Sequence, residues 1–408
     1  MKGTNLEIRA ATADEMEALM KVPSYAFANN EPPDPERPEP IRPEWTLCAF
    51  DGARPVATSG QYPFKMRFNG NGVLADGVTL VSTDPGYRRR GIVRELISRL
   101  LHQSKDNGVP ISILWASMGA IYQRFGYGLG TTFVEYDVEP RYVRFQFGER
   151  APGHTKLLDK DGALPALREI YRRYTADGSG LLHRGDELWQ LMFRAPPNQK
   201  LYAAVYYDPD EVPTAYCIYR SKWQELDTTP EADQVLEVFD FGWIDIDGYR
   251  GIWEYLAGHD LANRIRWYRV PEDDPAPAMM LEPRMLQRRT GDGIWLRIVD
   301  VEDALRARGY DWPGEVTLGV VNDDICSWND GCYRVASGGA EVEVERLADS
   351  AEVDIELDPS ALAGLVSGHT SASWLARMGR MRVARPERLL EIDQLFSTRR
   401  RPTCANMF

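Results

Sequence analysis

The sequence has few cysteines and histidines, and they are not spaced like the ligands of a metal. The five cysteines are odd in number and widely scattered: Cys48, Cys217, Cys326, Cys332 and Cys404. Such a set does not make a disulfide framework. Cys326 and Cys332 have the wrong spacing for a zinc knuckle, and the five histidines form no cluster. We therefore expect no bound metal.

Long apolar runs and an excess of positive charge are also missing. No run of eighteen apolar residues occurs, so we expect no transmembrane helix and no insertion into a membrane. The first ten residues, MKGTNLEIRA, lack the apolar core of a secretion signal, which favours a cytoplasmic protein. The 61 acidic residues outnumber the 48 basic ones, giving a net charge of −13. This balance disfavours nucleic acid and weakly favours cationic partners.

The length of 408 residues predicts several domains. In residues 1–150, strand-like and helix-like segments alternate as expected for a mixed α+β domain. Asp51-Gly52 and the sequence NGNG at 69–72 are hairpin signals between its strands. Residues 151–288 predict a second α+β unit, and residues 289–408 predict a third with alternating strands and helices.

A proline-rich acidic loop interrupts the first domain at NNEPPDPERPEPIRPEW, residues 29–45. Its density of proline excludes a regular helix or strand. The loop would line the mouth of a pocket for a cationic substrate, or it is a solvated charged segment, and the sequence leaves both interpretations open. Its acidic residues are Glu31, Asp34, Glu36, Glu39 and Glu44.

Three consecutive arginines and a glycine, Arg88 to Gly91, precede an amphipathic segment. Its apolar residues recur at helical spacing: Ile92, Val93, Leu96, Ile97, Leu100 and Leu101. The first N–H groups of a helix have no intrahelical partner, and the helix dipole adds partial positive charge. A glycine lets a phosphate approach that backbone. The pattern predicts a pyrophosphate site, with a solvated basic helix start as the alternative.

A faint internal repeat links the first two domains. GYRRRGIVRELISRLL at 86–101 and GYRGIWEYLAG at 248–258 each follow a strand and open a helix. The second copy has lost two of the arginines. We therefore interpret residues 151–288 as a duplicate that kept the architecture and lost the anion site.

The order of these motifs resembles the GCN5-related N-acetyltransferases (GNAT proteins). A strand, the turn from Arg88 to Val93, a helix, another strand and then Tyr-x-x-x-Gly-aromatic at 122–127 follow each other in that family. The turn departs from the family pattern at Val93, where a small residue is expected. Over the whole chain the sequence is similar to the enhanced intracellular survival (Eis) family. That resemblance implies an α+β fold of tandem GNAT domains, the second degenerate, and a C-terminal sterol-carrier-protein-like α+β domain at residues 289–408.

The resemblance also implies how the co-substrate acetyl-CoA is held. Main-chain groups of Val81 and Thr83 would pair with its pantetheine arm. The segment formed by Arg88, Arg89, Arg90, Gly91 and Ile92 would bind its pyrophosphate. Ser117 would contact it near the point where the central strands part, or it is an ordinary residue at a strand end.

Two groups are candidates for proton transfer. Tyr122 is the candidate general acid for the departing thiolate because a tyrosine is protonated at pH 7 and because its place in the Tyr-x-x-x-Gly-aromatic motif resembles that of the family's acid. The alternative is a core aromatic on a short helix. By resemblance to the Eis family, the α-carboxylate of the last residue, Phe408, would be the general base; the alternative is a frayed terminus. No cysteine or serine sits in a recognisable nucleophile–base arrangement, which favours direct attack by the amine on acetyl-CoA.

The expected activity is thus N-acetyl transfer to a primary amine of a cationic small molecule, aminoglycoside-like or a polyamine. One alternative acceptor is a protein lysine or N-terminus. Another reading is a lipid-binding or scaffold protein with vestigial transferase activity. The family resemblance further implies a homo-oligomer, with a hexamer as one option.

Overall fold

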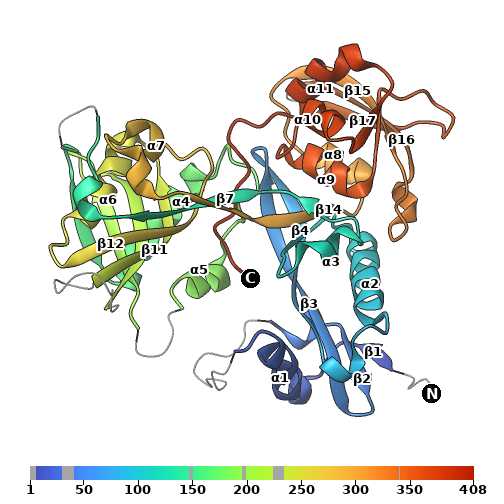
Figure 1. Ribbon diagram of the computed structural model, residues 1–408, viewed down its shortest axis with the longest axis horizontal. Coiled ribbons are helices and arrows are strands. Elements are labelled where there is room, and N and C mark those ends of the chain that lie inside the picture. The colour runs from blue at the N-terminus through green and yellow to red at the C-terminus, as the bar shows by residue number, and fades with distance from the viewer. Residues whose placement is uncertain (1–5, 30–40, 147–149, 195–198, 224–233, 340) are drawn as a thin grey trace. The chain divides into compact units, whose positions relative to one another are not determined.

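The computed structural model describes residues 6–29, 41–146, 150–194, 199–223, 234–339 and 341–408, which form two compact units (Figure 1). Unit 1 comprises Met1–Gly130, Ile294–Thr398 and Met407–Phe408. Unit 2 comprises Thr131–Gly293 and Arg399–Asn406. Among the described residues, no helix is both long enough and apolar enough to cross a membrane.

A seven-stranded sheet with the order β1-β2-β3-β4-β5-β14-β6 forms the first part of unit 1. The strands are β1 (Glu7–Arg9), β2 (Cys48–Asp51), β3 (Arg54–Phe68), β4 (Asn71–Thr83), β5 (Ile111–Trp115), β6 (Gly128–Leu129) and β14 (Ile294–Ile298). Strands β4 and β5 are parallel, and the other neighbouring pairs are antiparallel. The parallel pair at the centre needs a crossover, which a helix provides.

The long hairpin of β3 and β4 turns at Asn69 and Gly70. Both residues have positive φ, 51° and 86°, as a two-residue type I′ turn requires. The hairpin predicted from the Asn-Gly pair is confirmed by the pairing of the two strands.

Helices cover both faces of this sheet. Phe50 of β2 packs in a cluster with α1 (Met16–Ala26), whereas its neighbour Ala49 packs with α2 (Ile92–Asp106). Because successive side chains of a strand point to opposite faces, the two helices lie on opposite sides of the sheet. The short helix α3 (Gly119–Gln123) follows β5 and packs on the α2 side.

The second part of unit 1 is a five-stranded sheet with the order β17-β16-β15-β18-β19. Its strands are β15 (Pro313–Val320), β16 (Gly331–Gly338), β17 (Val342–Arg346), β18 (Ile355–Leu357) and β19 (Met381–Val383). Its helices are α8 (Val301–Ala307), α9 (Pro359–Ser367), α10 (Ala372–Arg377) and α11 (Leu389–Phe396). Helix α9 packs closely on β6, since a Cβ on Gly128 would lie 2.1 Å from the carbonyl oxygen of Ser360.

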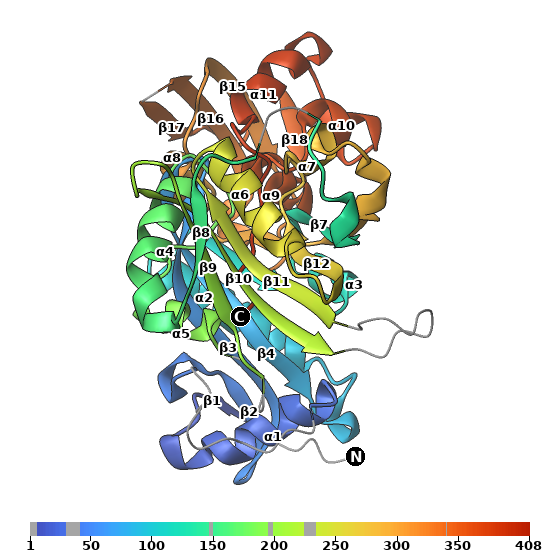
Figure 2. The same cartoon turned by 90° about the vertical axis from the view of Figure 1, so that its left-hand side faces the viewer.

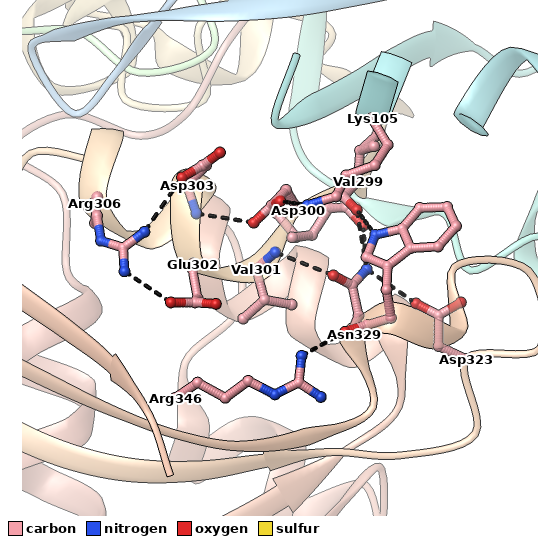
Figure 3. A network of polar contacts seen from close by, with 12 residues as sticks. Lys105, Val299, Asp300, Val301, Glu302, Asp303, Arg306, Asp323, Asn329 and Arg346 are labelled. Atoms are coloured by element: carbon pink, nitrogen blue, oxygen red, sulfur yellow. Dashed lines mark hydrogen bonds and ion pairs between the residues drawn. The ribbon is translucent and has the colours of Figure 1, made fainter. Parts of the chain in front are cut away.

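A buried asparagine joins the two parts of unit 1 (Figure 3). Asn329 accepts a hydrogen bond from the backbone N–H of Val301 at 3.2 Å and donates one to the carbonyl of Val299 at 3.1 Å. Lys105, near the end of α2, forms an ion pair with Asp300. The C-terminal end of α2 is thereby held to the start of α8.

Unit 2 contains a seven-stranded sheet with the order β13-β7-β12-β11-β10-β9-β8. Its strands are β7 (Thr132–Val138), β8 (His154–Leu158), β9 (Tyr202–Tyr207), β10 (Pro213–Trp223), β11 (Gln234–Trp243), β12 (Ala262–Val270) and β13 (Arg289–Asp292). Its helices are α4 (Lys160–Tyr174), α5 (Asp186–Met192), α6 (Ile246–Ala257) and α7 (Ala276–Met279). Figure 2 shows β8, β9, β10 and β11 side by side, and α4 contacts this sheet.

Two strands pair outside the domain in which the sequence places them. β7 was expected to end the first domain, but it pairs with β12 and β13 in the sheet of unit 2. β14 was expected in the third domain, but it lies between β5 and β6 in the first sheet. The local pattern predicts each strand and not its partner, because pairing is decided by contacts distant in sequence. The boundaries near 150 and 288 stay a prediction.

Candidate active site

Strands β4 and β5 pair along only part of their length. The parallel ladder ends at Val78 and Leu114, so residues 79–83 of β4 pair with β3 alone. Leu80 has a left-handed φ of 55° in this stretch, which marks an irregularity in the strand. One edge of residues 79–83 therefore has backbone groups that β5 does not bind.

Val81 and Thr83 lie in this open stretch of β4. Val81 is half-buried and packs at the margin of the cluster that holds α2. Thr83 is buried, and its Oγ1 has no hydrogen-bond partner among the described residues. A buried hydroxyl without a partner is costly, so this atom fits a position that contacts a polar ligand.

Helix α2 begins just beyond the end of β4. Its N-cap, Gly91, has a φ of 80°, and no side chain in the described structure caps the helix. A Cβ on Gly91 would meet no protein atom within 4 Å, and the left-handed φ of Gly91 favours glycine. The predicted buried face is confirmed for Ile92, Leu96 and their apolar partners, while Val93 is half-buried.

The three arginines surround this helix start and are exposed. Arg88 donates from Nε to the carbonyl oxygen of Thr83 at 3.2 Å. Arg90 donates to the carbonyl of Gly86 at 2.7 Å, and Arg89 has a left-handed φ of 62°. In the described part of the chain none of the three forms an ion pair with a carboxylate, so their charge is not neutralised by the protein. Together with the uncapped α2, they fit the pyrophosphate of acetyl-CoA.

Tyr122 lies in α3 and is 6% exposed. Burial raises its pKa to about 12, so the phenol stays protonated at neutral pH. Within the described residues its hydroxyl has no hydrogen-bond partner, whereas the hydroxyl of neighbouring Tyr127 shares a 2.8 Å hydrogen bond with Ser112. Tyr122 belongs to the same cluster as Ile92 of α2. Its hydroxyl is thus the one of this tyrosine pair left for a ligand.

The terminal residue packs on the other face of the sheet. The ring of Phe408 contacts Phe64 of β3 edge to face, with centroids 4.9 Å apart. Its Cε2 would lie 3.0 Å from a Cβ on Gly77, the residue before Val78 where the ladder ends. The same Cβ would lie 2.4 Å from the ring of Phe64, so Gly77 leaves room mainly for Phe64, on which Phe408 packs.

Two further rings extend this contact. Tyr62, two residues before Phe64 on the same face of β3, stacks on Phe64 at 5.6 Å, and Trp45 meets Tyr62 at 5.9 Å. Sequence reasoning missed this aromatic row of Trp45, Tyr62, Phe64 and Phe408. The alternating Tyr-x-Phe of the strand was a signal for the middle two rings, but nothing in the sequence pointed to their partners.

Three of the buried thiols are poorly suited to act as nucleophiles, and the described residues present no metal-binding group. Burial raises the pKa of the Cys48 and Cys404 thiols to about 11 and that of Cys326 to about 12. Buried thiols of this kind are poor nucleophiles at neutral pH. No group of three or more His, Cys, Asp or Glu side chains in the described ranges is arranged to hold a metal ion.

Comparison with known proteins agrees with this geometry. The family model described as "Acetyltransferase (GNAT) domain" matches residues 7–130, and a second model of that description matches residues 180–298. A "Sterol carrier protein domain" model matches residues 301–405. The N-acetyltransferase Eis of Mycobacterium tuberculosis is 30% identical over 337 residues, which cover 79% of this chain and 78% of Eis. The chain belongs to the Eis family of N-acetyltransferases.

Other known proteins are similar to this chain in sequence or in fold. An N-acetyltransferase of Streptomyces avermitilis is 30% identical over 86% of this chain and 87% of its own length. The crystal structure of Eis1 from Mycobacterium abscessus matches 99% of this chain and 100% of Eis1, with a TM-score of 0.82 and 28% identity. A GCN5-related N-acetyltransferase from Anabaena variabilis, at 21% identity, has the same fold with a TM-score of 0.87 and covers 99% and 100% of the two chains.

As a member of the Eis family, the chain is an N-acetyltransferase with two GNAT domains and a sterol-carrier-like domain. GNAT domains use acetyl-CoA as the co-substrate that supplies the acetyl group. The sequence-based resemblance to this family and the predicted fold class are confirmed by these matches.

The structure brings most of the predicted site residues together. Val81, Ile92 and Tyr122 share one cluster, and Thr83 is bonded to Arg88. Ser117 lies exposed beyond the end of β5, and its role stays a prediction. Of the acidic loop, Glu44 is exposed. The other acidic residues of that loop lie outside the described residues: Glu31, Asp34, Glu36 and Glu39.

Proposed function

We propose that this enzyme transfers the acetyl group of acetyl-CoA directly to a primary amine of a cationic small molecule, either aminoglycoside-like or a polyamine. The observation that carries the proposal is the open stretch of β4 that leads to the uncapped start of α2. Both features leave backbone donors and acceptors free for a ligand, and the arginines add positive charge for phosphate.

The proposed co-substrate site runs along β4. The backbone of Val81 and Thr83 would pair with the amides of the pantetheine arm, as a neighbouring strand would. Arg88, Arg90 and the N–H groups after Gly91 would hold the pyrophosphate. Such fixed contacts orient the thioester, and orientation is a large part of catalysis in a reaction between two bound substrates.

In the proposed transfer, the amine nitrogen attacks the thioester carbon and the C–S bond breaks. Tyr122 gives its phenolic proton to the departing thiolate. The raised pKa of Tyr122 keeps this proton in place at neutral pH. The α-carboxylate of Phe408 accepts a proton from the attacking nitrogen, directly or through water, so that the acetylated amine leaves neutral at that nitrogen.

The preference for a cationic acceptor rests on the surroundings of Phe408. Tyr62 and Phe64 present ring faces and edges next to Phe408, and Trp45 extends the row. Aromatic faces attract ammonium groups by 0.5 kcal/mol or more, roughly, and favour cations over neutral amines. The net charge of −13 acts in the same direction at longer range.

The deciding experiment measures free thiol released from acetyl-CoA with a panel of aminoglycosides and polyamines. The native chain is compared with a variant extended by a few residues after Phe408. We expect turnover with the native chain and its loss on extension, with acetyl-CoA binding retained in both.

Each other outcome changes a defined part of the proposal. Turnover that survives the extension would keep the transferase and remove Phe408 as the base. Binding of acetyl-CoA without turnover of any small amine would point to a protein lysine or N-terminus as acceptor. Stabilisation by a fatty acyl ligand and not by CoA would favour the lipid-binding alternative.

A further inference from the structure

The second GNAT copy, in unit 2, also contains a parallel pair of strands that part. β11 and β12 pair in parallel up to Val238 and Trp267, and beyond this point β11 pairs with β10 alone. Arg269, on the diverging end of β12, has a left-handed φ of 57°. These two strands correspond in order to β4 and β5, so the opening between them is the counterpart of the proposed acetyl-CoA site.

The C-terminal segment of the chain fills this opening. The carbonyl of Ala405 accepts a hydrogen bond from Arg269 Nε at 2.9 Å, and the N–H of Thr403 donates to the carbonyl of Ser179 at 2.9 Å. Residues from β11, β12 and the tail together line a remaining cavity of about 10 Å³. A cavity of this size is about the smallest that holds a single water, so no cofactor fits beside the tail.

Asn406 is the most tightly held residue of the segment. It is fully buried, and its Oδ1 accepts hydrogen bonds from Arg184 at 3.4 Å and from Tyr171 at 3.5 Å. Arg184 is itself buried and forms a two-pronged ion pair with Asp240 of β11 at 2.5 and 2.9 Å. Removing a partner from a buried charged network leaves groups unsatisfied, which is costly. The network thus fixes a residue that is two positions from the chain end.

Buried contacts continue along the rest of the segment. The guanidinium of Arg400 lies over the ring of Tyr174, 4.5 Å from its centroid. Cys404 is 1% exposed. A terminal segment is normally frayed unless specific contacts hold it, and this one has such contacts from its first residues to Asn406.

We infer that the second GNAT copy serves as a receptor for the chain's own C-terminal segment, with Arg184, Asp240 and Asn406 as positioning residues for Phe408. The cleft that binds a co-substrate in an active copy binds residues 403–406 in this one. The positioning role rests on the proposed function of Phe408, whereas the anchoring of the segment does not.

Asn406→Ala tests the inference, with Met407→Ala as the matched control because Met407 is exposed. The first readout is the alkylation rate of Cys404 by iodoacetamide, located by peptide mass mapping. We expect Asn406→Ala to accelerate it at least tenfold and Met407→Ala to leave it unchanged. Cys217, fully buried in β10 of the same unit, reports unfolding and should stay protected in both variants.

The second readout is the kinetics of acetyl transfer. We expect Asn406→Ala to lower kcat about tenfold or more, with the KM for acetyl-CoA within twofold of native. Asn406→Asp keeps an acceptor for Arg184 and should recover most of the loss.

Unchanged alkylation of Cys404 in Asn406→Ala would overturn the anchor, whatever happens to kcat. Faster alkylation with native kcat would keep the anchor and contradict both the positioning role and Phe408 as the base. Faster alkylation of Cys217 together with Cys404 would mean that the substitution unfolds unit 2. In that case the anchor is tested by Arg269→Met, which removes a single hydrogen bond to the tail backbone and should accelerate Cys404 alone, and protection of Cys404 in that variant would contradict the anchor.

Discussion

Helices α2 and α6 start at equivalent places in the two GNAT copies, yet their first turns are built differently. Within the part of the chain that the structure describes, α2 begins after Gly91 with no side-chain cap and with exposed arginines before it. α6 begins after Asp245, whose carboxylate accepts a hydrogen bond from the N–H of Gly248 at 2.7 Å. Asp247 adds a second acidic group in the first turn of α6. In the first copy, no acidic side chain of the described residues caps the positive end of the helix dipole. In the second copy Asp245 and Asp247 place negative charge at the helix start.

The Gly-Tyr-Arg sequence shared by the two copies shows the same divergence. Arg88 precedes α2 and is exposed, whereas Arg250 lies within α6, is 9% exposed, and has its guanidinium 5.6 Å from the ring centroid of Phe145. In the second copy, Gly251 packs against Tyr206 so closely that a Cβ would lie 2.2 Å from that ring. The duplicated helix has become part of a core. The second copy therefore differs from the first by more than the two missing arginines, because one of its own side chains now bonds an N–H group at the start of α6.

The largest expected effect comes from Tyr122, whose hydroxyl has no partner among the described residues. Tyr122→Phe removes the proposed proton donor, and we expect kcat to fall about 100-fold to 10,000-fold. Tyr127→Phe is the matched control, because its hydroxyl is bonded to Ser112 and its ring lies in the same cluster. That variant should lose stability and keep kcat within a few-fold. Steady-state kinetics at saturating acetyl-CoA measures both, and a native kcat in Tyr122→Phe would exclude it as the acid.

The arginines test the anion site directly. The double variant Arg88→Ala/Arg90→Ala removes two charge-assisted contacts, so we expect the Kd of CoA to rise about 10-fold to 100-fold. The Kd of the native chain should also rise with salt concentration more steeply than that of the variant. Arg250→Ala changes the arginine of the Gly-Tyr-Arg sequence in the second copy, and it should lower the thermal stability of unit 2 without changing the Kd. Calorimetric titration with CoA distinguishes these outcomes, and an equal Kd in all three proteins would contradict the site.

A buried carboxylate makes the stability of the second copy depend on pH. Asp274 Oδ1 accepts hydrogen bonds from Tyr136, Tyr249 and the N–H of Ala276, while its Oδ2 has no partner among the described residues. Burial raises the pKa of Asp274 to about 6. The folded state therefore holds its proton more tightly than the unfolded state, and this residue's contribution to stability falls as the pH rises from about 4 to above 6.

Asp274→Asn removes this titration. The free energy of unfolding of the variant minus that of the native chain should be about 2 kcal/mol larger at pH 7 than at pH 4.5. This value follows from the difference between a pKa near 4 in the unfolded state and one near 6 in the folded state. Urea unfolding of native and variant chains at both pH values gives this double difference, in which any constant effect of the substitution cancels. A difference that does not change with pH would show that Asp274 titrates normally.

Local features of the first copy could be predicted from the sequence because each depends on a few adjacent residues. The Asn69-Gly70 turn, the helix after Gly91 and the exposed arginines follow from backbone preferences and apolar spacing. The left-handed φ of Gly91 was not predicted, and its role beside a phosphate stays a prediction. Tyr122 was predicted from its motif, and its role as the acid stays a prediction. The sequence does not show that, among the described residues, Ser112 bonds the hydroxyl of Tyr127 and not that of Tyr122.

The parts that could not be predicted join residues far apart in the chain. The placement of β7 and β14 depends on which strand edges are available, and a single strand's pattern carries no such information. The same holds for Phe64 beside Phe408 and for Asn406 beside Arg184. The sequence near a chain end is the same whether its residues pack against the folded protein or are exposed to solvent, so it does not distinguish the two.

The smallest expected effects come from single substitutions at the two helix starts. Both substitutions should lower the stability by similar amounts, for different reasons. Asp245→Ala removes the cap of α6 and should lower the stability of unit 2 by about 1 kcal/mol. Gly91→Ala meets no steric clash but forces a residue with a Cβ into a left-handed φ of 80°, which costs about 1 kcal/mol as well. Thermal unfolding should thus change alike, while the Kd of CoA should rise only for Gly91→Ala, because only that helix start is proposed to hold the pyrophosphate. If Asp245→Ala raised the Kd and Gly91→Ala did not, the roles of the two copies would be reversed.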